Sequence, residues 1–205
     1  MIKEHVNNDY SLIFHAPLTS DVNDVINQIQ GVNVDGTWDA YAADRGIKIV
    51  AQQYKSNVYW NISTLRALLL SATTILIRAD VYLLNFVSAI PNTNNYTYFT
   101  ITDTPTNYNS ATAKQGILVA SGNVSVTSFI ANNTQNTLQY TYKDITDNSA
   151  ILLNENLTRG TIIEGSNTLL RTRINSCNYL QFCSKVYSAG GTFSGYVKDL
   201  KIWVK

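Results

Sequence analysis

Charged residues are scarce in this sequence, and their scarcity limits the partners that the protein can bind. Asp, Glu, Lys and Arg make up 14% of the 205 residues, and the formal net charge is +1, whereas soluble domains average roughly 25% charged residues. Binding to nucleic acid requires clustered Lys and Arg that neutralise phosphates, but the 15 basic residues are scattered along this chain. The composition therefore argues against nucleic acid as a partner.

Long hydrophobic segments are missing as well. Residues 1–9 are polar and lack the apolar core of a signal peptide. The longest apolar run, around residues 68–70, is much shorter than the ~20 residues that a membrane span requires. We therefore expect no membrane partner and a protein that is made in a cytoplasm.

Cysteine is scarce, which excludes a fold held together by a network of disulfides. Cys177 and Cys183 are the only cysteines in the sequence, and two are too few for such a framework. If one strand carries both, their spacing places them on the same face but too far apart to bond. Reduced thiols are therefore expected, and a bridge across a hairpin is the alternative.

Few titratable side chains have the spacing that catalysis requires. His5 lies in the polar N-terminal segment and His15 in the first expected strand, where we expect it to be half exposed, and no Gly-x-Ser-x-Gly elbow accompanies them. Glycosidases need two suitably placed carboxyl groups, but Glu4, Glu155 and Glu164 have no acidic neighbour two or four residues away. We therefore predict that the protein is not an enzyme.

Short segments of alternating polar and apolar residues, separated by Gly, Asn, Asp, Ser and Pro, are abundant in the sequence. This pattern is typical of antiparallel β-sheets. The expected strands cover residues 10–18, 47–52, 57–62, 74–86, 96–102, 116–120, 124–130, 138–142, 161–164, 169–174, 179–187 and 194–204. We predict a polar arm over residues 1–9 and one all-β domain over residues 10–205, an antiparallel β-sandwich with at most one or two short helices.

Three connections in this scheme are more specific. Residues 47–52 and 57–62 are expected to form a hairpin around Lys55 and Ser56. Val22, Val25, Ile26 and Ile29 recur at helical spacing, which predicts a short helix over residues 21–29. Residues 63–70 fit either a helical turn or a connecting strand.

The first and last strands are expected to pair. Leu12, Phe14, Ala16 and Leu18 alternate strictly, and we expect Leu12 and Phe14 to share one core with Leu200 and Ile202 of the last strand. The last strand changes phase: its apolar residues have one parity before Lys198 and the opposite parity after Asp199. An extra residue near Lys198 and Asp199 would return both halves to the same core, which predicts a β-bulge there.

The two ends of the chain also resemble a known family. The opening pattern Leu-x-Phe-x-x-Pro-Leu followed by Asp-Val-Asn-Asp, and the closing Gly-Thr-Phe-Ser-Gly-Tyr-Val-Lys-Asp-Leu-Lys-Ile-Trp, are similar to those of laminin-G-like, concanavalin-type jelly rolls. Residues 46–49 with 57–62 resemble the early hairpin of that family, and residues 74–83 its long central strand. Gln52 and Gln53 stand where such hairpins usually have Gly and Asp. The resemblance implies a concanavalin-like jelly roll.

The same resemblance implies that calcium could be bound, because laminin-G-like domains often hold this ion with an Asp and loop carbonyls. Asp21, Asp24, Asp35 and Asp39 lie in suitable loops. Turn and helix-capping roles are nevertheless expected for these aspartates, and no Cys or His cluster has the spacing of a zinc site. We therefore assign no cofactor and no metal ligand.

Aromatic residues on the expected strands are the best candidates for contact with a ligand or partner, because a flat apolar ring with a polar edge suits a sugar. Trp203 has the parity opposite to Leu200, Ile202 and Val204, so it should point away from the core. The opposite face of the central strand carries a charge pair and an aromatic side chain. The candidate residues are Trp203, Arg78, Asp80, Tyr82, Trp38, Tyr59 and Trp60. Packing in the core or against a loop is the alternative for each aromatic residue.

These features predict a non-enzymatic structural or adhesive protein. By resemblance, an Asn-, Thr- and Tyr-rich jelly roll without a catalytic partner is similar to phage capsid decoration and head-fibre proteins. That resemblance implies a virion surface protein that assembles with copies of itself and with other virion proteins. The alternative is a lectin-like carbohydrate-binding module, with a glycan as its partner. A glycoside hydrolase or lyase of the same fold would need the carboxylate pair that the sequence lacks.

Overall fold

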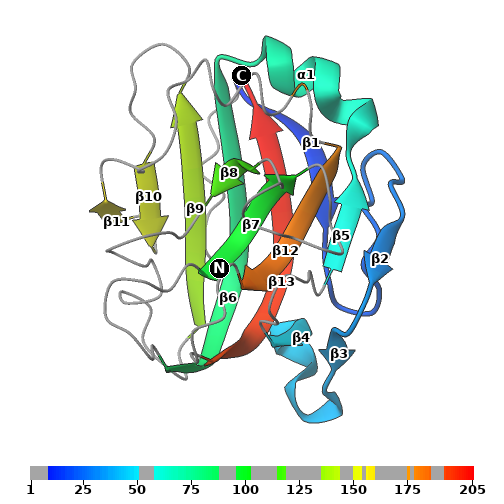
Figure 1. Cartoon of the computed structure of the whole chain (residues 1–205), viewed down its shortest axis with the longest axis vertical. Coiled ribbons are helices and arrows are strands. Elements are labelled where there is room, and N and C mark those ends of the chain that lie inside the picture. The colour runs from blue at the N-terminus through cyan, green and yellow to red at the C-terminus, as the bar shows by residue number, and fades with distance from the viewer. Residues whose placement is uncertain are drawn as a thin grey trace.

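The computed structural model describes residues 9–50, 58–87, 96–102, 115–118, 135–143, 150–153, 156–159, 175, 178–185 and 192–205. These residues form two antiparallel sheets that pack as a sandwich (Figure 1). The all-β fold class predicted from the sequence is therefore confirmed. The expected strands over residues 124–130, 161–164 and 169–174 lie outside the described residues, as do Cys177, Gln52, Gln53 and residues 1–8 of the N-terminal arm.

Eight of the described strands form the larger sheet, here called the large sheet. Its order is β11 (Asn156–Arg159), β10 (Ala150–Leu153), β9 (Gln135–Lys143), β6 (Thr74–Val87), β13 (Thr192–Val204), β4 (Ile47–Val50) and β3 (Thr37–Trp38), with β1 (Ser11–Ala16) also paired to β13. The small sheet has five described strands, in the order β2 (Gly31–Asn33), β5 (Val58–Asn61), β12 (Tyr179–Lys185), β7 (Tyr96–Thr102) and β8 (Gln115–Leu118).

The described helices are short and lie at the ends of the sandwich (Figure 1). A 3-10 helix, η1 (Ala40–Arg45), connects β3 to β4, and η2 (Ser63–Leu65) continues into α1 (Arg66–Ser71) between β5 and β6. Residues 63–70 therefore take the helical alternative of the two that the sequence allowed. None of the described helices is long and apolar enough to span a membrane.

The predicted bulge in the last strand is confirmed. Between Lys198 and Lys201, β13 has two residues where β6 has one, and Asp199 has a φ of 60°. This positive φ is uncommon for a residue other than glycine and re-aims the strand. The side chains on both sides of the bulge are therefore buried together: Val197, Leu200 and Ile202 are each at most 1% exposed.

The predicted pairing of the terminal strands is also confirmed. β1 lies antiparallel to β13, with Phe14 opposite Ile202 and Ala16 opposite Leu200. The expected position of Leu12 in this core is wrong, because a second irregularity falls between Leu12 and Phe14. Ile13 is 5% exposed, whereas Leu12 is only half-buried and pairs with Trp203 on the other face.

The predicted hairpin of residues 47–52 and 57–62 is wrong, because the two strands belong to different sheets. β4 pairs with β13 of the large sheet, and β5 pairs with β12 of the small sheet. Ile47 and Ile49 of β4, and Val58 and Trp60 of β5, are all fully buried. β4 therefore supplies apolar side chains to the core from the large sheet, and β5 supplies them from the small sheet. The two strands of a hairpin would lie in one sheet.

The predicted helix over residues 21–29 is also wrong: this segment is a loop. The reason is Asp24, whose buried carboxylate accepts hydrogen bonds from the backbone amides of His15, Ile26 and Asn27 at 2.7, 3.1 and 2.8 Å. Short polar side chains that bind nearby backbone amides compete with helix formation. Val25 and Ile26 consequently point outward, at 56% and 44% exposure.

The core between the sheets is centred on two aromatic side chains. Phe14 of the large sheet and Trp60 of the small sheet are fully buried, and their rings meet edge-to-face with centroids 5.3 Å apart. The Trp60 indole NH donates to the Val22 carbonyl oxygen, so the polar edge of this ring also fixes the loop before β2.

Candidate functional site

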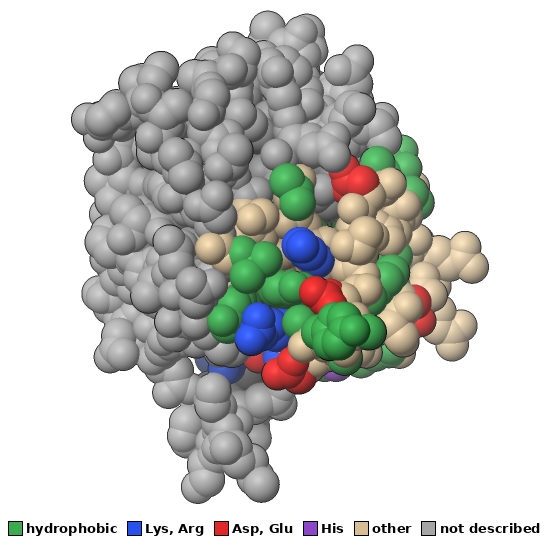
Figure 2. Space-filling model, turned by 90° about the horizontal axis from the view of Figure 1, so that it is seen from below, with side chains coloured by type: hydrophobic (Ala, Val, Ile, Leu, Met, Phe, Trp, Pro, Cys, Tyr) green, Lys and Arg blue, Asp and Glu red, His purple; other side chains and the backbone are tan. Residues whose placement is uncertain are grey.

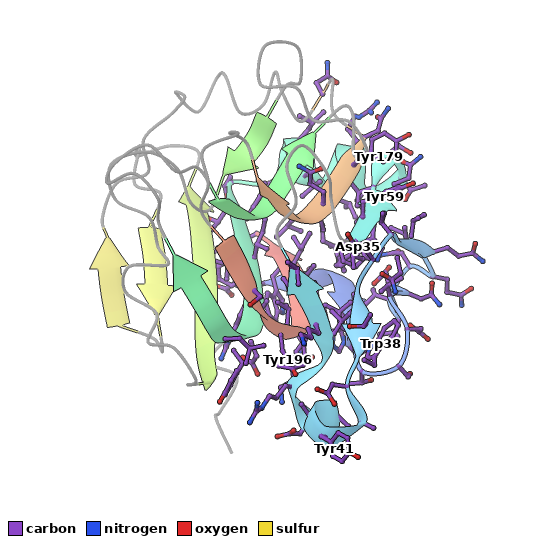
Figure 3. The ribbon with its side chains drawn as sticks, turned by 60° about the horizontal axis from the view of Figure 1, so that its bottom comes forward. Asp35, Trp38, Tyr41, Tyr59, Tyr179 and Tyr196 are labelled. Atoms are coloured by element: carbon purple, nitrogen blue, oxygen red, sulfur yellow. The ribbon has the colours of Figure 1, made fainter. Side chains whose placement is uncertain are left out.

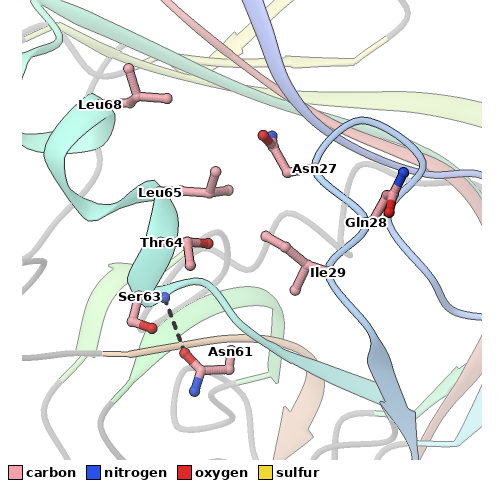
Figure 4. A pocket seen from close by; sticks show the side chains of 8 residues that line it. All are labelled: Asn27, Gln28, Ile29, Asn61, Ser63, Thr64, Leu65 and Leu68. Atoms are coloured by element: carbon pink, nitrogen blue, oxygen red, sulfur yellow. Dashed lines mark hydrogen bonds between the residues drawn. The ribbon is translucent and has the colours of Figure 1, made fainter.

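A shallow pocket of about 430 Å³ lies where the loop before β2 faces the helical segment after β5. Figure 4 shows Asn27 and Ile29 reaching into it from the loop, and Thr64 and Leu65 from the helical segment. Its lining residues are Asn27, Gln28, Ile29, Asn61, Ser63, Thr64, Leu65 and Leu68. The volume falls within the roughly 300–1,000 Å³ that is usual for small-molecule sites.

The loop wall of the pocket is held in place by bonds to the first strand. Asp24 binds the amides of Ile26 and Asn27 as well as that of His15 in β1, and its own amide donates to the Ile29 carbonyl at 2.9 Å. The Asn27 side-chain amide donates to the Ile13 carbonyl at 2.7 Å. These bonds fix the loop before any ligand arrives, so binding would require little ordering of this wall.

The opposite wall is built from the end of β5 and the helices that follow. The Asn61 side-chain oxygen accepts the Ser63 amide at 3.1 Å, and the Leu65 amide donates to the Ile62 carbonyl at 2.9 Å. Leu65 is 2% exposed and anchors this wall in the core, while Leu68 remains 45% exposed at the rim. The wall therefore combines a buried apolar support with polar groups at its surface.

No ionisable side chain is among the described residues that line the pocket. Amides of Asn27, Gln28 and Asn61 and the hydroxyl groups of Ser63 and Thr64 can donate and accept hydrogen bonds. Ile29, Leu65 and Leu68 add apolar contact surface. Such a lining suits a neutral ligand that has many hydroxyl groups on a carbon framework.

Two tyrosines lie beside the pocket on the outer face of the small sheet. Tyr59 and Tyr179 have the parity opposite to the fully buried Trp60 and Leu180, and both are half-buried. Their rings meet edge-to-face with centroids 5.9 Å apart, and Figure 3 shows them together at one side of the sandwich. Asn61 joins the two features, because it lines the pocket and pairs directly with Tyr179.

The structure buries two of the three tryptophans, Trp60 and Trp203, and leaves Trp38 half-buried. Trp60 is fully buried in the core. Trp203 lies on the face opposite to Ile202, as its parity predicts, but it is only 5% exposed and cannot serve as the expected contact residue. Trp38 is half-buried, and its indole NH donates to the Leu18 carbonyl at 3.1 Å, which fixes the loop after β1.

Contacts within the chain cover one residue of the predicted face of the central strand, Tyr82. Arg78, Asp80 and Tyr82 are each half-buried. The guanidinium of Arg45, in η1, lies 3.9 Å from the centroid of the Tyr82 ring, and Tyr196 meets the same ring edge-to-face at 6.3 Å. Tyr82 is therefore covered on one side and is not an open stacking surface.

The cluster of Arg45, Tyr82 and Tyr196 also includes Asp39, and the pKa values of Asp39 and Tyr196 are shifted. The Tyr196 hydroxyl donates to Asp39 at 3.0 Å. The backbone amide of Tyr41 and then this hydroxyl lower the pKa of Asp39, whereas burial and then the Asp39 hydrogen bond raise the pKa of Tyr196. Figure 2 views this end of the molecule, where described charged side chains of both signs lie among hydrophobic ones. The cluster therefore holds η1 against the large sheet and leaves Tyr41, fully exposed, at its tip.

Another polar cluster, formed by His15, Asp199 and Lys201, lies at the bulge in β13. The His15 Nε2 lies 2.6 Å from Asp199, and Lys201 lies 3.3 Å from the same carboxylate. Burial raises the pKa of Asp199, but the hydrogen bond with His15 and the charge of Lys201 outweigh it, so this pKa is lowered. The His15 side chain is 21% exposed, in agreement with the half-exposed position expected from the sequence.

Turn and capping roles are confirmed for three of the four aspartates in the loops. Asp21 accepts the amide of Asn23 at 2.8 Å, Asp39 caps η1, and Asp24 holds the loop before β2. Among the described residues, His, Cys, Asp and Glu form no group of three that could hold a metal ion.

Sequence reasoning identified only Tyr59 of the residues at the pocket and the tyrosine pair. The loop wall was missed because the spacing of its aliphatic residues predicted a helix over residues 21–29. The helical wall was missed because residues 63–70 fitted either a helical turn or a strand. The pocket joins segments more than 30 residues apart, since Ile29 faces Thr64. No local pattern signals such an encounter.

No protein-family model matches the chain, and no curated protein matches it in sequence. Solved structures match in fold. Botulinum neurotoxin type C, whose cell entry depends on interaction with two ganglioside molecules, aligns with a TM-score of 0.61 and 14% identity. The binding domain of botulinum neurotoxin DC, in complex with SialylT, aligns with a TM-score of 0.56 and 11% identity.

Domain 4 of AbnA, a GH43 extracellular arabinanase from Geobacillus stearothermophilus, in complex with arabinotriose, aligns with a TM-score of 0.55 and 10% identity. Each comparison covers 95% of this chain. The chain spans about half the length of the two neurotoxin chains, at 48%, but 93% of the arabinanase domain. The chain therefore has the β-sandwich, jelly-roll fold of these binding domains.

Proposed function

We propose that this β-sandwich is a carbohydrate-binding module without catalytic activity, and that the pocket between the loop before β2 and the helical segment is its binding site. The observation that carries the proposal is the lining: amides, hydroxyl groups and aliphatic side chains, with no ionisable group among them. Sugars present the same mixture of hydroxyl groups and apolar CH faces. The two adjacent tyrosines add the aromatic surface that suits a sugar ring.

The fold neighbours support this class of function. Two neurotoxin structures are described with gangliosides or SialylT, and the arabinanase domain is described with arabinotriose. Those ligands belong to the neighbours, and sequence identities of 10–14% carry over the fold alone. The neighbours, as structures described with bound or interacting glycans, favour a binding module over the catalytic alternative. The sequence agrees, since it lacks a suitably spaced pair of carboxylates.

A glycan array followed by titration calorimetry tests the proposal. The native chain should bind at least one glycan, and Thr64→Val should weaken that binding by about 2- to 10-fold, since one hydrogen bond contributes roughly 0.5–1.5 kcal/mol. Tyr41→Ala is the control, because this fully exposed side chain does not line the pocket and lies at the tip of η1, far from Tyr59 and Tyr179 in Figure 3. An array without any bound glycan would refute the proposal.

A role on a virion surface, in an assembly with copies of itself and with other virion proteins, is our second proposal. Assembly with other protein surfaces is supported by branched aliphatic side chains in β2 and in the loops on either side of it: Val25, Ile26, Val32 and Val34 are 43–56% exposed. Low charge gives little repulsion between copies, and many copies strengthen a weak contact. Light scattering across a concentration series tests the assembly with copies of itself: a constant monomer mass that Val32→Glu leaves unchanged would count against it.

A further inference from the structure

We infer that the pocket and the tyrosine pair are two parts of one extended site for a neutral oligosaccharide, an inference that rests on the proposed function. One sugar unit occupies the pocket, and the next unit lies against Tyr59 and Tyr179. Asn61 stands at the junction of the two parts and contacts both units.

The strand geometry places the two parts next to each other. Asn61 lines the pocket and is directly opposite Tyr179 in the pairing of β5 with β12. Neighbouring strands are about 4.8 Å apart, and Tyr59 precedes Asn61 by two residues, or roughly 6.7 Å along the strand. All three side chains share the outer face, because Trp60 and Leu180 between them are fully buried on the inner face. These spacings are comparable to the separation of linked sugar rings.

The two tyrosines offer a surface of the right kind for the second unit. Their edge-to-face arrangement, at 5.9 Å and 83°, fixes each ring against the other. Both side chains are half-buried, so each is supported by the sheet and still accessible. Aromatic rings fixed in this way bind the apolar face of a sugar with little loss of side-chain freedom.

The charges near the site favour a neutral ligand over an acidic one. Recognition of a carboxylate typically uses a paired Arg, yet the described lining contains no cation. Arg66 follows the lining residue Leu65, but its guanidinium donates to the side-chain oxygen of Asn178. The carboxylate of an acidic sugar would therefore lose its hydration in the pocket without gaining contact with a cation.

An array of linear oligosaccharides with one to four units tests the inference. It should contain neutral arabinan, xylan, glucan and galactan series and, as acidic arms, oligogalacturonates and 3′-sialyllactose. We expect neutral ligands to bind, and affinity to rise at least tenfold between one and two units. Tyr179→Ala should abolish this rise without weakening the single unit, whereas Thr64→Val should weaken every length by the same factor.

The outcomes separate this inference from the function on which it rests. A chain that binds no glycan refutes the proposed function. A preference for acidic ligands, or affinities that do not depend on length, or an unchanged length dependence in Tyr179→Ala, overturns the inference while carbohydrate binding stands. Circular dichroism must show that Tyr179→Ala is folded; if it is not, Tyr59→Ala provides the same test from the neighbouring strand, and Tyr41→Ala remains the control.

Discussion

Replacing Ile202 by alanine should destabilise the protein by about 2–5 kcal/mol, the cost of emptying a buried aliphatic site. Ile202 is fully buried in β13, between Phe14 of β1 and Ile77 of β6. The change removes three carbon atoms, worth roughly 0.8 kcal/mol each in transfer from water, and the cavity that they leave adds to this sum. Because both flanking strands are held by β13, the site has little freedom to collapse.

Urea unfolding followed by tryptophan fluorescence measures this loss. With a slope of roughly 2–3 kcal/mol per molar urea, the midpoint should fall by about 1–2 M, and the melting temperature should fall by roughly 2–4 °C for each kcal/mol.

Ile26→Ala is the matched control, because it removes the same atoms from a side chain that is 44% exposed. Its effect should stay below about 1 kcal/mol. If the two variants unfold at the same urea concentration, Ile202 does not lie in a shared core of the terminal strands, and the reasoning that joins β1 to β13 fails.

Three further predictions concern polar groups. Asp24→Ala leaves the amides of Ile26 and Asn27 without their acceptor, so it should lower both stability, by about 1–3 kcal/mol in urea unfolding, and glycan affinity in calorimetry; unchanged affinity would show that the loop wall is not needed. Asp199 has a lowered pKa, so its stabilising effect should be complete above its ordinary pKa of 3.8 and be lost as the pH falls through the lower folded value. The stability advantage of the native chain over Asp199→Asn should therefore shrink in acid, and an advantage that grows there would contradict the assignment. Arg45→Gln removes the cation from Tyr82 and should cost about 0.5–2 kcal/mol, with faster amide exchange in η1 as the local readout and unchanged exchange as the contrary result.

The positions of most described strands and the bulge could be predicted from the sequence because both depend on parity, whereas β2, β3, β10 and β11 were not among the expected strands. A change from Val197 to Leu200 as the buried residue requires an extra residue, and Asp199 supplies it. The same reasoning missed the irregularity after Leu12, because Ile13 is apolar as well and a run of apolar residues hides a change of phase. Parity is informative only where polar residues alternate with apolar ones.

Parity did not predict which strands pair with one another or which segments meet in the fold. β4 and β5 are close in the sequence and have the alternation of a hairpin, yet they pair in different layers. The aliphatic spacing of residues 21–29 predicted a helix, but one buried carboxylate, that of Asp24, fixes the segment as a loop. The pocket depends on both outcomes, so its two walls could not be found before the strands were assigned to their sheets.

The central position of β13 has a consequence for how the sandwich forms. β13 follows all the other described strands in the sequence, yet it pairs with β6 on one side and with β4 and β1 on the other. The contact of His15 with Asp199 spans 184 residues, so the entropy of closing this loop must be overcome before the contact stabilises anything. During synthesis, the edges of β1, β4 and β6 that pair with β13 remain without this partner until β13 leaves the ribosome. The large sheet is therefore completed from its middle, and a growing chain is most vulnerable to aggregation before β13 appears.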